Sequence, residues 1–369
     1  MRLVIALLLA LCAQPVLAQE PEAVAAPATV PAPQATAVLQ AAVNSVIRPA
    51  MVDFKNRSSG LVSAMTALCT VPSPGALMIA KGQFRQTALA YGRVEPIRIG
   101  PLMEDNRAER VLFWPDRRGI ALRQVQAILA DSDETATDPA TLRDKSVAVQ
   151  GLGALEYVLF GTDALVLQGP EGAFRCRYGK AIATSIARVA QELAVGWYDP
   201  DGIAQHLTSP NPANADYRTE TEALEELVGI LSHGVEAARD QRLKPFLAQG
   251  DAAAKPKQAL FWRSGLTMPM LRANLESLRD LLLRSGVGKL VGTKDIGLEN
   301  SIGFEFRNAS RALDLVTLPV EAAVEDEKQA FALNYLLLVT QSLQGMIGEQ
   351  LSGAMGLSVG FSALDGDGG

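Results

Sequence analysis

Aromatic residues and histidine are both scarce in this chain of 369 residues. Phe, Tyr and Trp make up 5% of the sequence, and the two histidines are His206 and His233. Few aromatics beside abundant Ala and Leu favour helices packed through small and medium side chains over a β-sandwich. Neither histidine belongs to a His-x-x-x-His or Glu-x-x-His pair, from which zinc hydrolases usually take their ligands. The histidine count therefore disfavours a zinc hydrolase.

Clustered positive charge is also missing. The formal net charge is −6, and no stripe of lysine and arginine is visible, so we expect no nucleic-acid partner. No Gly-x-Ser-x-Gly elbow or phosphate-binding loop occurs, and neither Cys69 nor Cys176 has a neighbouring histidine in the sequence. After the N-terminus we find no uninterrupted apolar run of ~18 residues, so we expect no transmembrane helix in the mature chain.

The first 18 residues have the pattern of a Sec-type signal peptide. Arg2 precedes an apolar stretch, Leu3–Cys12, and Val16-Leu17-Ala18 is a small-residue cleavage pattern. Cleavage near Ala18 predicts an exported, periplasmic protein. A lipoprotein is the weaker alternative, because the residue before Cys12 is a leucine, which is large for a lipidation signal.

Removal of the signal peptide leaves two cysteines, Cys69 and Cys176. In an oxidising compartment a pair of cysteines more often forms a disulfide than two free thiols. We therefore predict a Cys69–Cys176 disulfide, with two separate buried thiols as the alternative.

The rest of the pattern predicts an all-α chain of two tandem four-helix-type bundles. No run shows sustained period-2 alternation, and apolar residues recur at helical spacing. The polar, proline-bearing stretch Asp199–Asp216 separates the two halves. The predicted organisation is a signal peptide (1–18), a disordered Ala/Pro-rich leader (19–35), an N-terminal bundle (36–205), a C-terminal bundle (206–364) and a flexible tail (365–369).

Helices are expected at 74–91, 101–114, 117–131, 139–161 and 172–197, after a first helix bent at Pro49. In the second half, three apolar stripes at helical spacing predict bundle core: Leu224, Leu227, Leu231 and Val235; Leu271, Leu275, Leu278 and Leu282; Phe331, Tyr335, Val339 and Leu343.

The segment Gly151–Glu156 carries the first candidate site. Positions 153 and 156 are neighbours on one helical face, a spacing that suits two ligands of one metal, but Gly153 has no side chain to donate. Two glycines within the expected helix also cost stability, so Gly151 and Gly153 indicate either close helix packing or room for a ligand.

Glu156 stands in an otherwise apolar run, between Leu155 and Tyr157. A carboxylate among apolar residues must be solvated or paired, because burying an unpaired charge is costly. It is therefore either a ligand or substrate-orienting anion, or half of a structural ion pair with an arginine.

A second candidate segment is Gly100–Asp116. Arg107, Arg110 and Trp114 share one face of the expected helix, and either arginine is a suitable partner for Glu156. Pro115 should end this helix, after which Asp116 either caps the next helix or faces a ligand. Trp114 is either a buried anchor at the junction or part of a binding surface.

Together these segments resemble the imelysin family. Gly151–Glu156 is similar to a Gly-x-His-x-x-Glu motif, with Gly153 in place of the histidine. The other similar segments are Arg107–Asp116 (RAERVLFWPD), Phe174–Ile182 (FRCRYGKAI) and the ending Gly356–Asp367 (GLSVGFSALDGD). The resemblance implies two four-helix-type bundles with the motif helix near a groove between them. It also implies a periplasmic role in iron or haem acquisition.

Carried over residue by residue, the resemblance makes Arg107, Arg110, Trp114, Asp116, Gly151, Gly153 and Glu156 candidates for the groove. Glu156 is the candidate ligand for iron or another divalent metal. Expected partners are iron, haem or a small ligand, and periplasmic or outer-membrane iron-uptake proteins. No catalytic residue is assigned, because one Glu without the motif histidine falls short of a catalytic zinc site.

The leading hypothesis is a non-enzymatic periplasmic binding or accessory protein. A metallopeptidase-like hydrolase, with Glu156 and other carboxylates around a metal, is the enzymatic alternative. A structural or partner-binding bundle that has lost the metal site is the third.

Overall fold

The computed structural model describes residues 30–116, 118–358 and 360. The predicted signal peptide, most of the leader and the tail 365–369 lie outside the described residues. Within these residues the regular elements are helical, and the only β feature is an isolated bridge between Gln249 and Ala252. The predicted all-α fold is confirmed.

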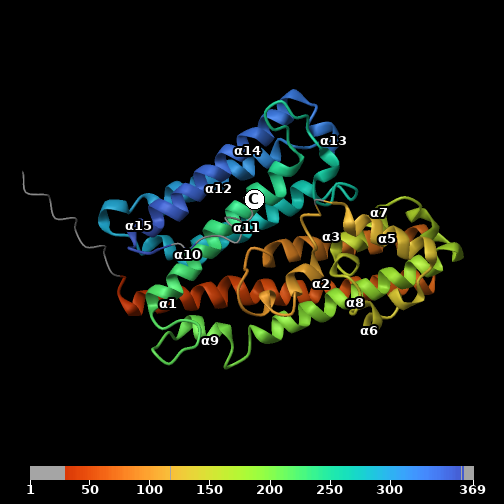
Figure 1. Ribbon diagram of the computed structural model, residues 1–369. Helices are drawn as coiled ribbons and strands as arrows, with labels where there is room; N and C mark the ends of the chain where they lie inside the picture. Colours follow the sequence, from red (N-terminus) through yellow and green to blue (C-terminus); the bar gives the residue numbers. More distant parts are fainter. Residues whose placement is uncertain (1–29, 117, 359, 361–369) are drawn as a thin grey trace, which may run out of the picture.

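The longer helices form two groups (Figure 1). In the first, α2 packs against α3 and α8, and the short α7 packs against α8 and α3. In the second, α11 and α14 each pack against both α10 and α12. The bounds of the first group and its attached short helices are α2 (Arg48–Thr70), α3 (Pro74–Val94), α4 (Arg107–Val111), α5 (Ile120–Asp131), α6 (Pro139–Leu142), α7 (Leu152–Phe160), α8 (Ala173–Gly196) and α9 (Ile203–Thr208). Those of the second are α10 (Glu220–Ala237), α11 (Thr267–Ser285), α12 (Leu298–Asp314), α13 (Val320–Ala323), α14 (Glu327–Gly345) and α15 (Ser352–Ala354).

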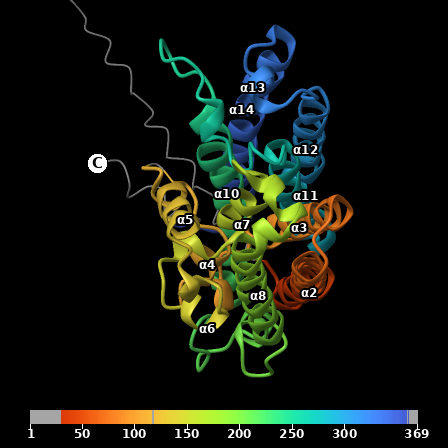
Figure 2. The same cartoon turned by 90° about the vertical axis from the view of Figure 1, so that its right-hand side faces the viewer.

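The two groups share an extensive apolar and polar interface. Figure 2, seen along the bundles, shows α3 beside α11, with α4, α5 and α6 on the opposite side of the molecule. At the α3–α11 contact, the Ser277 hydroxyl donates to the Arg93 carbonyl at 2.6 Å and the Asn274 amide donates to the Gly92 carbonyl at 2.7 Å. Buried apolar side chains from both groups form one continuous core. The domain boundary at 205/206 stays a prediction.

The N-terminal helix spans both groups. α1 (Ala32–Ala42) continues through a π-helical stretch at Val43–Ile47 into α2. Pro49 directly follows Arg48 at the start of α2, inside this continuous helical run, so its missing N–H removes one helical hydrogen bond. α1 packs against α10 and α11 of the second group. Because α1 begins at Ala32, the last four residues of the predicted leader are helical instead of disordered.

The disulfide between Cys69 of α2 and Cys176 of α8 is present. It links two helices that also pack along their length, and it joins cysteines that are 107 residues apart in the sequence. The predicted pairing is confirmed.

Two of the three apolar stripes form core as predicted: Leu224, Leu227, Leu231, Val235, Leu271, Leu275, Leu278 and Leu282 are buried. The third is only half correct. Val339 and Leu343 are buried, but Phe331 is 73% exposed and Tyr335 is 39% exposed. Helix α14 packs on α10 and α12 through one face, so the apolar residues on its other face remain uncovered within the described chain. By length and composition, the helical run Glu327–Ala354 would also be sufficient to cross a membrane.

Two predicted helix boundaries are wrong. The expected helix 139–161 is broken into α6, a 3₁₀ turn at Val147–Val149, and α7, which begins only at Leu152. The expected helix 101–114 is a 3₁₀ turn followed by the short α4. Asp105 and Asn106 adopt positive φ angles of 52° and 55°, which a continuous right-handed helix does not allow.

Candidate ligand pocket around Glu156

Gly151, the residue directly before helix α7, lies where a larger residue does not fit. Gly151 is the N-cap residue, in extended conformation, and a Cβ added there would lie 2.4 Å from the carbonyl oxygen of Val111. The backbone of α4 therefore approaches α7 too closely for any side chain. Close helix packing therefore explains why residue 151 is a glycine. Gly151 lies at the start of a helix and not within it, as the sequence analysis expected.

Gly153 has different surroundings. It lies in the first turn of α7, and a Cβ added there would meet no atom within 4 Å. The missing side chain at 153 therefore leaves open space. A residue at this position would extend from the positive end of the α7 helix dipole into that space.

Glu156, one turn further along α7, is buried, with 4% of its surface exposed. Its Oε1 atom accepts two hydrogen bonds from Ser264, one from the backbone N–H at 2.9 Å and one from the hydroxyl at 2.8 Å. Burial raises the pKa of the Glu156 carboxyl, and the Ser264 hydrogen bonds and the nearby Arg263 charge oppose that rise. The predicted ion pair between Glu156 and Arg107 or Arg110 is wrong, because Glu156 bonds to Ser264 and the two arginines bond to other partners.

The loop that supplies Ser264 comes from the other half of the chain, just before α11. It turns at Phe261 (φ 57°) and Gly265 (φ 66°), and the Thr267 hydroxyl donates back to the Leu260 carbonyl at 2.7 Å. This turn places the guanidinium of Arg263 4.5 Å from the Trp262 ring centre and 5.4 Å from that of Tyr157. Cation–π contacts of this kind position the charge without neutralising it.

These elements enclose a cavity of about 270 Å³, which we call the motif pocket. One wall comes from the 113–125 segment and the start of α7, and the other from the loop before α11. The described side chains that give it its chemistry are Trp114, Asp116, Glu156, Tyr157, Lys257, Trp262 and Arg263, with Gly153 at its wall. The pocket combines a buried carboxyl, two cations and aromatic faces at the junction of the two helix groups.

Two of the predicted groove residues have clear structural partners at this pocket. The indole N–H of Trp114 donates to the Gln241 carbonyl at 3.0 Å, which ties the Trp-Pro-Asp corner to the second half of the chain. The Asp116 carboxylate caps α5, accepting from the backbone N–H groups of Ile120 at 2.7 Å and Ala121 at 2.9 Å. The peptide bond between Trp114 and Pro115 is cis.

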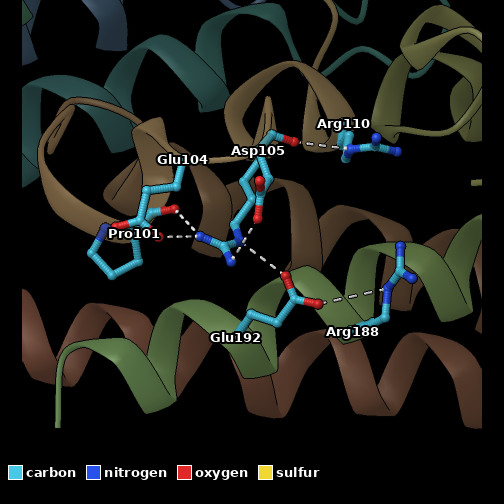
Figure 3. A network of polar contacts seen from close by, with 7 residues as sticks. Pro101, Glu104, Asp105, Arg110, Arg188 and Glu192 are labelled. Atoms are coloured by element: carbon cyan, nitrogen blue, oxygen red, sulfur yellow. Dashed lines mark hydrogen bonds and ion pairs between the residues drawn. The ribbon is translucent and has the colours of Figure 1, made fainter. Parts of the chain in front are cut away.

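Arg107 and Arg110 lie outside the motif pocket, in a network that fastens α4 to its neighbours (Figure 3). The Arg107 guanidinium donates to Glu192 of α8 at 2.9 Å, to Glu104 at 2.8 Å and to the Pro101 carbonyl at 2.9 Å. Arg110 donates to the Asp105 and Arg143 carbonyls, both at 3.1 Å. The two arginines share a helix with neither Glu156 nor Trp114, so the predicted cationic ridge does not face the pocket.

The histidines also lie away from the motif pocket. His206 Nδ1 is 2.5 Å from the Asp216 carboxylate, and His233 Nε2 is 3.0 Å from the Gly360 carbonyl. Among the described residues no three His, Cys, Asp or Glu side chains come together as a metal site. A bare metal ion at Glu156 would therefore lack a set of three such protein ligands.

Sequence reasoning missed the residues of the second wall, although a signal for them exists. The triplet Leu112-Phe113-Trp114 recurs as Leu260-Phe261-Trp262, and residues of both triplets line the motif pocket. The second triplet continues into Arg263 and Ser264, which both act on the Glu156 carboxyl. A repetition of three residues is too short to predict, from the sequence alone, that the two segments meet.

Comparison with known proteins supports the fold and the family. A family model described as imelysin matches residues 47–345. An imelysin-like protein from Psychrobacter arcticum 273-4 is similar in structure, with a TM-score of 0.74, 18% identity, and coverage of 90% of this chain and 100% of that one. A protein from Parabacteroides distasonis ATCC 8503, provisionally described as an iron-regulated protein A precursor, has a TM-score of 0.72 and 15% identity, with 89% and 96% of the two chains covered. No curated protein matches the chain.

At these identities the solved structures establish a shared fold. The family model spans most of the chain, including the motif helix α7, the Trp-Pro-Asp corner and the loop that supplies Ser264. The chain belongs to the imelysin family.

Proposed function

We propose that this protein is a non-enzymatic periplasmic binding protein that takes a small ligand in the motif pocket, in the context of iron uptake. The observation that carries the proposal is the open space beside Gly153, next to the buried Glu156 carboxyl. Ligand sites in proteins are typically concave, largely apolar and provided with a few placed polar groups. The motif pocket has this character.

The chemistry of the pocket favours a metal that arrives with its own ligands. Among the described residues Glu156 does not belong to any group of three or more His, Cys, Asp or Glu side chains that could hold a bare ion. Lys257 and Arg263 are cations that suit the carboxylates of an anionic chelate. Glu156 then supplies one hard oxygen ligand to iron, through the carboxylate oxygen that Ser264 does not occupy.

The size of the pocket supports a small chelate over haem. At about 270 Å³ the cavity lies just below the range of ~300–1,000 Å³ that is typical of small-molecule sites. The iron context itself rests on the name of the Parabacteroides relative, and the periplasmic location rests on the N-terminal signal pattern.

Calorimetric titration of the full chain, made without tag histidines, tests the proposal. The probes are ferric citrate, citrate alone, Zn²⁺ and haemin, and the variants are Glu156→Ala and, as a matched control, Glu171→Ala on an exposed site. We expect ferric citrate to bind the wild type and the control alike, and Glu156→Ala to weaken binding by about tenfold or more. Absence of binding by all four probes would refute the iron version.

A Gly153→His variant is a gain-of-function arm of the same test. The space at 153 accepts a side chain, and the introduced imidazole would lie one turn from Glu156, an arrangement that supports shared metal ligation. We expect Zn²⁺ to bind this variant more tightly than the wild type. Equal Zn²⁺ affinities would show that the Glu156 carboxylate does not face this space.

The two alternatives have less support. A metallopeptidase needs metal ligands beyond Glu156, and the described residues do not gather them. A bundle without a site would lock Glu156 to an arginine in a dry interface, whereas here Glu156 bonds to Ser264 beside a cavity. Metal-dependent cleavage of a protein substrate by the purified chain would favour the peptidase instead.

A further inference from the structure

The guanidinium of Arg263 lies between the two walls of the motif pocket. It is 4.5 Å from the ring centre of Trp262, in the loop before α11, and 5.4 Å from that of Tyr157, in α7. Arg263 and both aromatic residues line the pocket, and Arg263 is partly exposed. Its charge is therefore located at the pocket and is accessible to a ligand.

The aromatic contacts leave the N–H donors of Arg263 unused. A cation–π contact attracts the charge of a guanidinium but provides no hydrogen-bond acceptor in the guanidinium plane, where the donors lie. Among the described residues, no group accepts a hydrogen bond from the Arg263 side chain and none forms an ion pair with it. Its charge acts on the Glu156 carboxyl through space only.

Arg175 provides a contrast at the same ring. Its guanidinium lies 5.7 Å from the Tyr157 ring centre, on the side of α8. It is buried, and it donates to the carbonyls of Tyr157, Val158 and Thr162. The donors of Arg175 are therefore used by the backbone of the protein, whereas those of Arg263 remain available to a ligand.

Lys257 adds a second cation on the same side of the motif pocket. Its Nζ atom is 5.8 Å from the Trp262 ring centre, so both cations lie near one indole. The acids of the pocket have other partners: Asp116 caps α5 through both oxygens, and Glu156 Oε1 accepts from Ser264. No ion pair joins either cation to an acid among the described residues. The pocket thus contains two neighbouring positive charges without a matching carboxylate.

We propose that Arg263 and Lys257 form a carboxylate subsite of the motif pocket, which binds a small polycarboxylate with or without a metal. The planar guanidinium of Arg263 suits one carboxylate through two parallel hydrogen bonds, and the Lys257 ammonium attracts a second one as a point charge. Two cations therefore favour a ligand with at least two carboxylates over a monocarboxylate. The inference rests on the proposed function, in which the same ligand carries the metal to Glu156.

Calorimetric titration of the full chain in metal-free buffer tests the subsite. The probes are tricarballylate, which has the carboxylates of citrate but lacks the hydroxyl group that assists chelation, together with acetate and inorganic phosphate. We expect tricarballylate to bind the wild type, and acetate and phosphate to bind about tenfold more weakly or less. No binding of tricarballylate, or equally tight binding of acetate or phosphate, would overturn the proposal.

Variants locate the binding. Arg263→Gln removes the charge and should weaken tricarballylate binding by about tenfold or more, and Arg263→Lys, which keeps the charge but not the planar donor pair, should have an intermediate affinity. Arg177→Gln, the same change in an exposed ion pair outside the pocket, should bind like the wild type. Circular dichroism melting curves establish that each variant is folded. Wild-type affinity in Arg263→Gln would overturn the proposal.

The Glu156→Ala variant distinguishes this inference from the iron proposal. It removes the metal ligand and also a charge that repels carboxylates, so it should weaken the binding of ferric citrate but not that of tricarballylate. If Glu156→Ala binds ferric citrate like the wild type while Arg263→Gln loses tricarballylate, the iron proposal fails and the subsite stands. If Glu156→Ala weakens ferric citrate binding while Arg263→Gln binds tricarballylate like the wild type, the subsite fails and the iron proposal stands.

Discussion

Gly151 and Gly153 are two residues apart but serve different purposes. Gly151 is required by the Val111 carbonyl, whereas Gly153 faces open space. We predict that Gly151→Ala destabilises the protein by roughly 1–3 kcal/mol through overpacking. Gly153→Ala should be neutral or stabilising by about 0.5–1 kcal/mol, because alanine favours the helix more. Urea unfolding of the two variants measures both effects, and equal destabilisation would contradict these distinct roles.

The second prediction at this scale concerns Glu156 and pH. Because its folded-state pKa is raised, the folded protein holds the proton more tightly than the unfolded chain does. The contribution of this carboxyl to stability is therefore fully present below the ordinary glutamate pKa, and it is lost as pH rises towards the folded-state value. Glu156→Gln keeps an oxygen that accepts from Ser264 but does not titrate.

Melting temperatures of the wild type and Glu156→Gln, measured from acid to neutral pH, check this sign. We expect the melting temperature of Glu156→Gln to rise relative to that of the wild type as pH rises from the ordinary glutamate pKa to the folded-state pKa. Above the folded-state pKa the difference between the two melting temperatures should stay constant. If the melting temperature of the wild type instead rises relative to that of the variant with rising pH, a cation stabilises the Glu156 carboxylate, contrary to the structure.

At the scale of elements, the position of α7 depends on Arg175 of α8. Its buried guanidinium donates to three carbonyls at the end of α7 and beyond: Val158 at 2.9 Å, Tyr157 at 2.8 Å and Thr162 at 2.7 Å. A cation at a helix C-terminus satisfies carbonyls that have no helical partner and opposes the negative end of the dipole. Arg175 therefore fixes the helix that carries Glu156.

We predict that Arg175→Met costs roughly 2–4 kcal/mol, because buried carbonyls lose charged donors. Arg177→Met is the matched control in the same helix. Its ion pair with Glu134 is exposed, so its loss should cost about 0–1 kcal/mol. Chemical denaturation measures the two values. Similar losses for the two variants would mean that Arg175 does not hold α7.

At the scale of the whole molecule, the sequence predicted what depends on local pattern. The all-α class, the Cys69–Cys176 disulfide and the stripes along α10 and α11 followed from helical periodicity and cysteine count. The close approach of α4 to Gly151, just before α7, did not, since no local pattern reveals it.

The candidate site was predictable on one side only. Glu156, Gly153, Trp114 and Asp116 were identified and do line the motif pocket, while Arg107 and Arg110 belong to a network elsewhere. Ser264 and Arg263 come from a loop more than a hundred residues away, and their place depends on how the two helix groups meet. Tertiary packing of this kind is not encoded in spacing along one segment.

An iron chelate held through Glu156 in the motif pocket is the main functional proposal for this protein. The decisive measurement is the calorimetric titration of ferric citrate into the wild type and Glu156→Ala. We predict binding to the wild type that the variant weakens by about tenfold or more, while Glu171→Ala binds normally. Equal affinity of the wild type and Glu156→Ala, or no binding to either, would contradict the proposal.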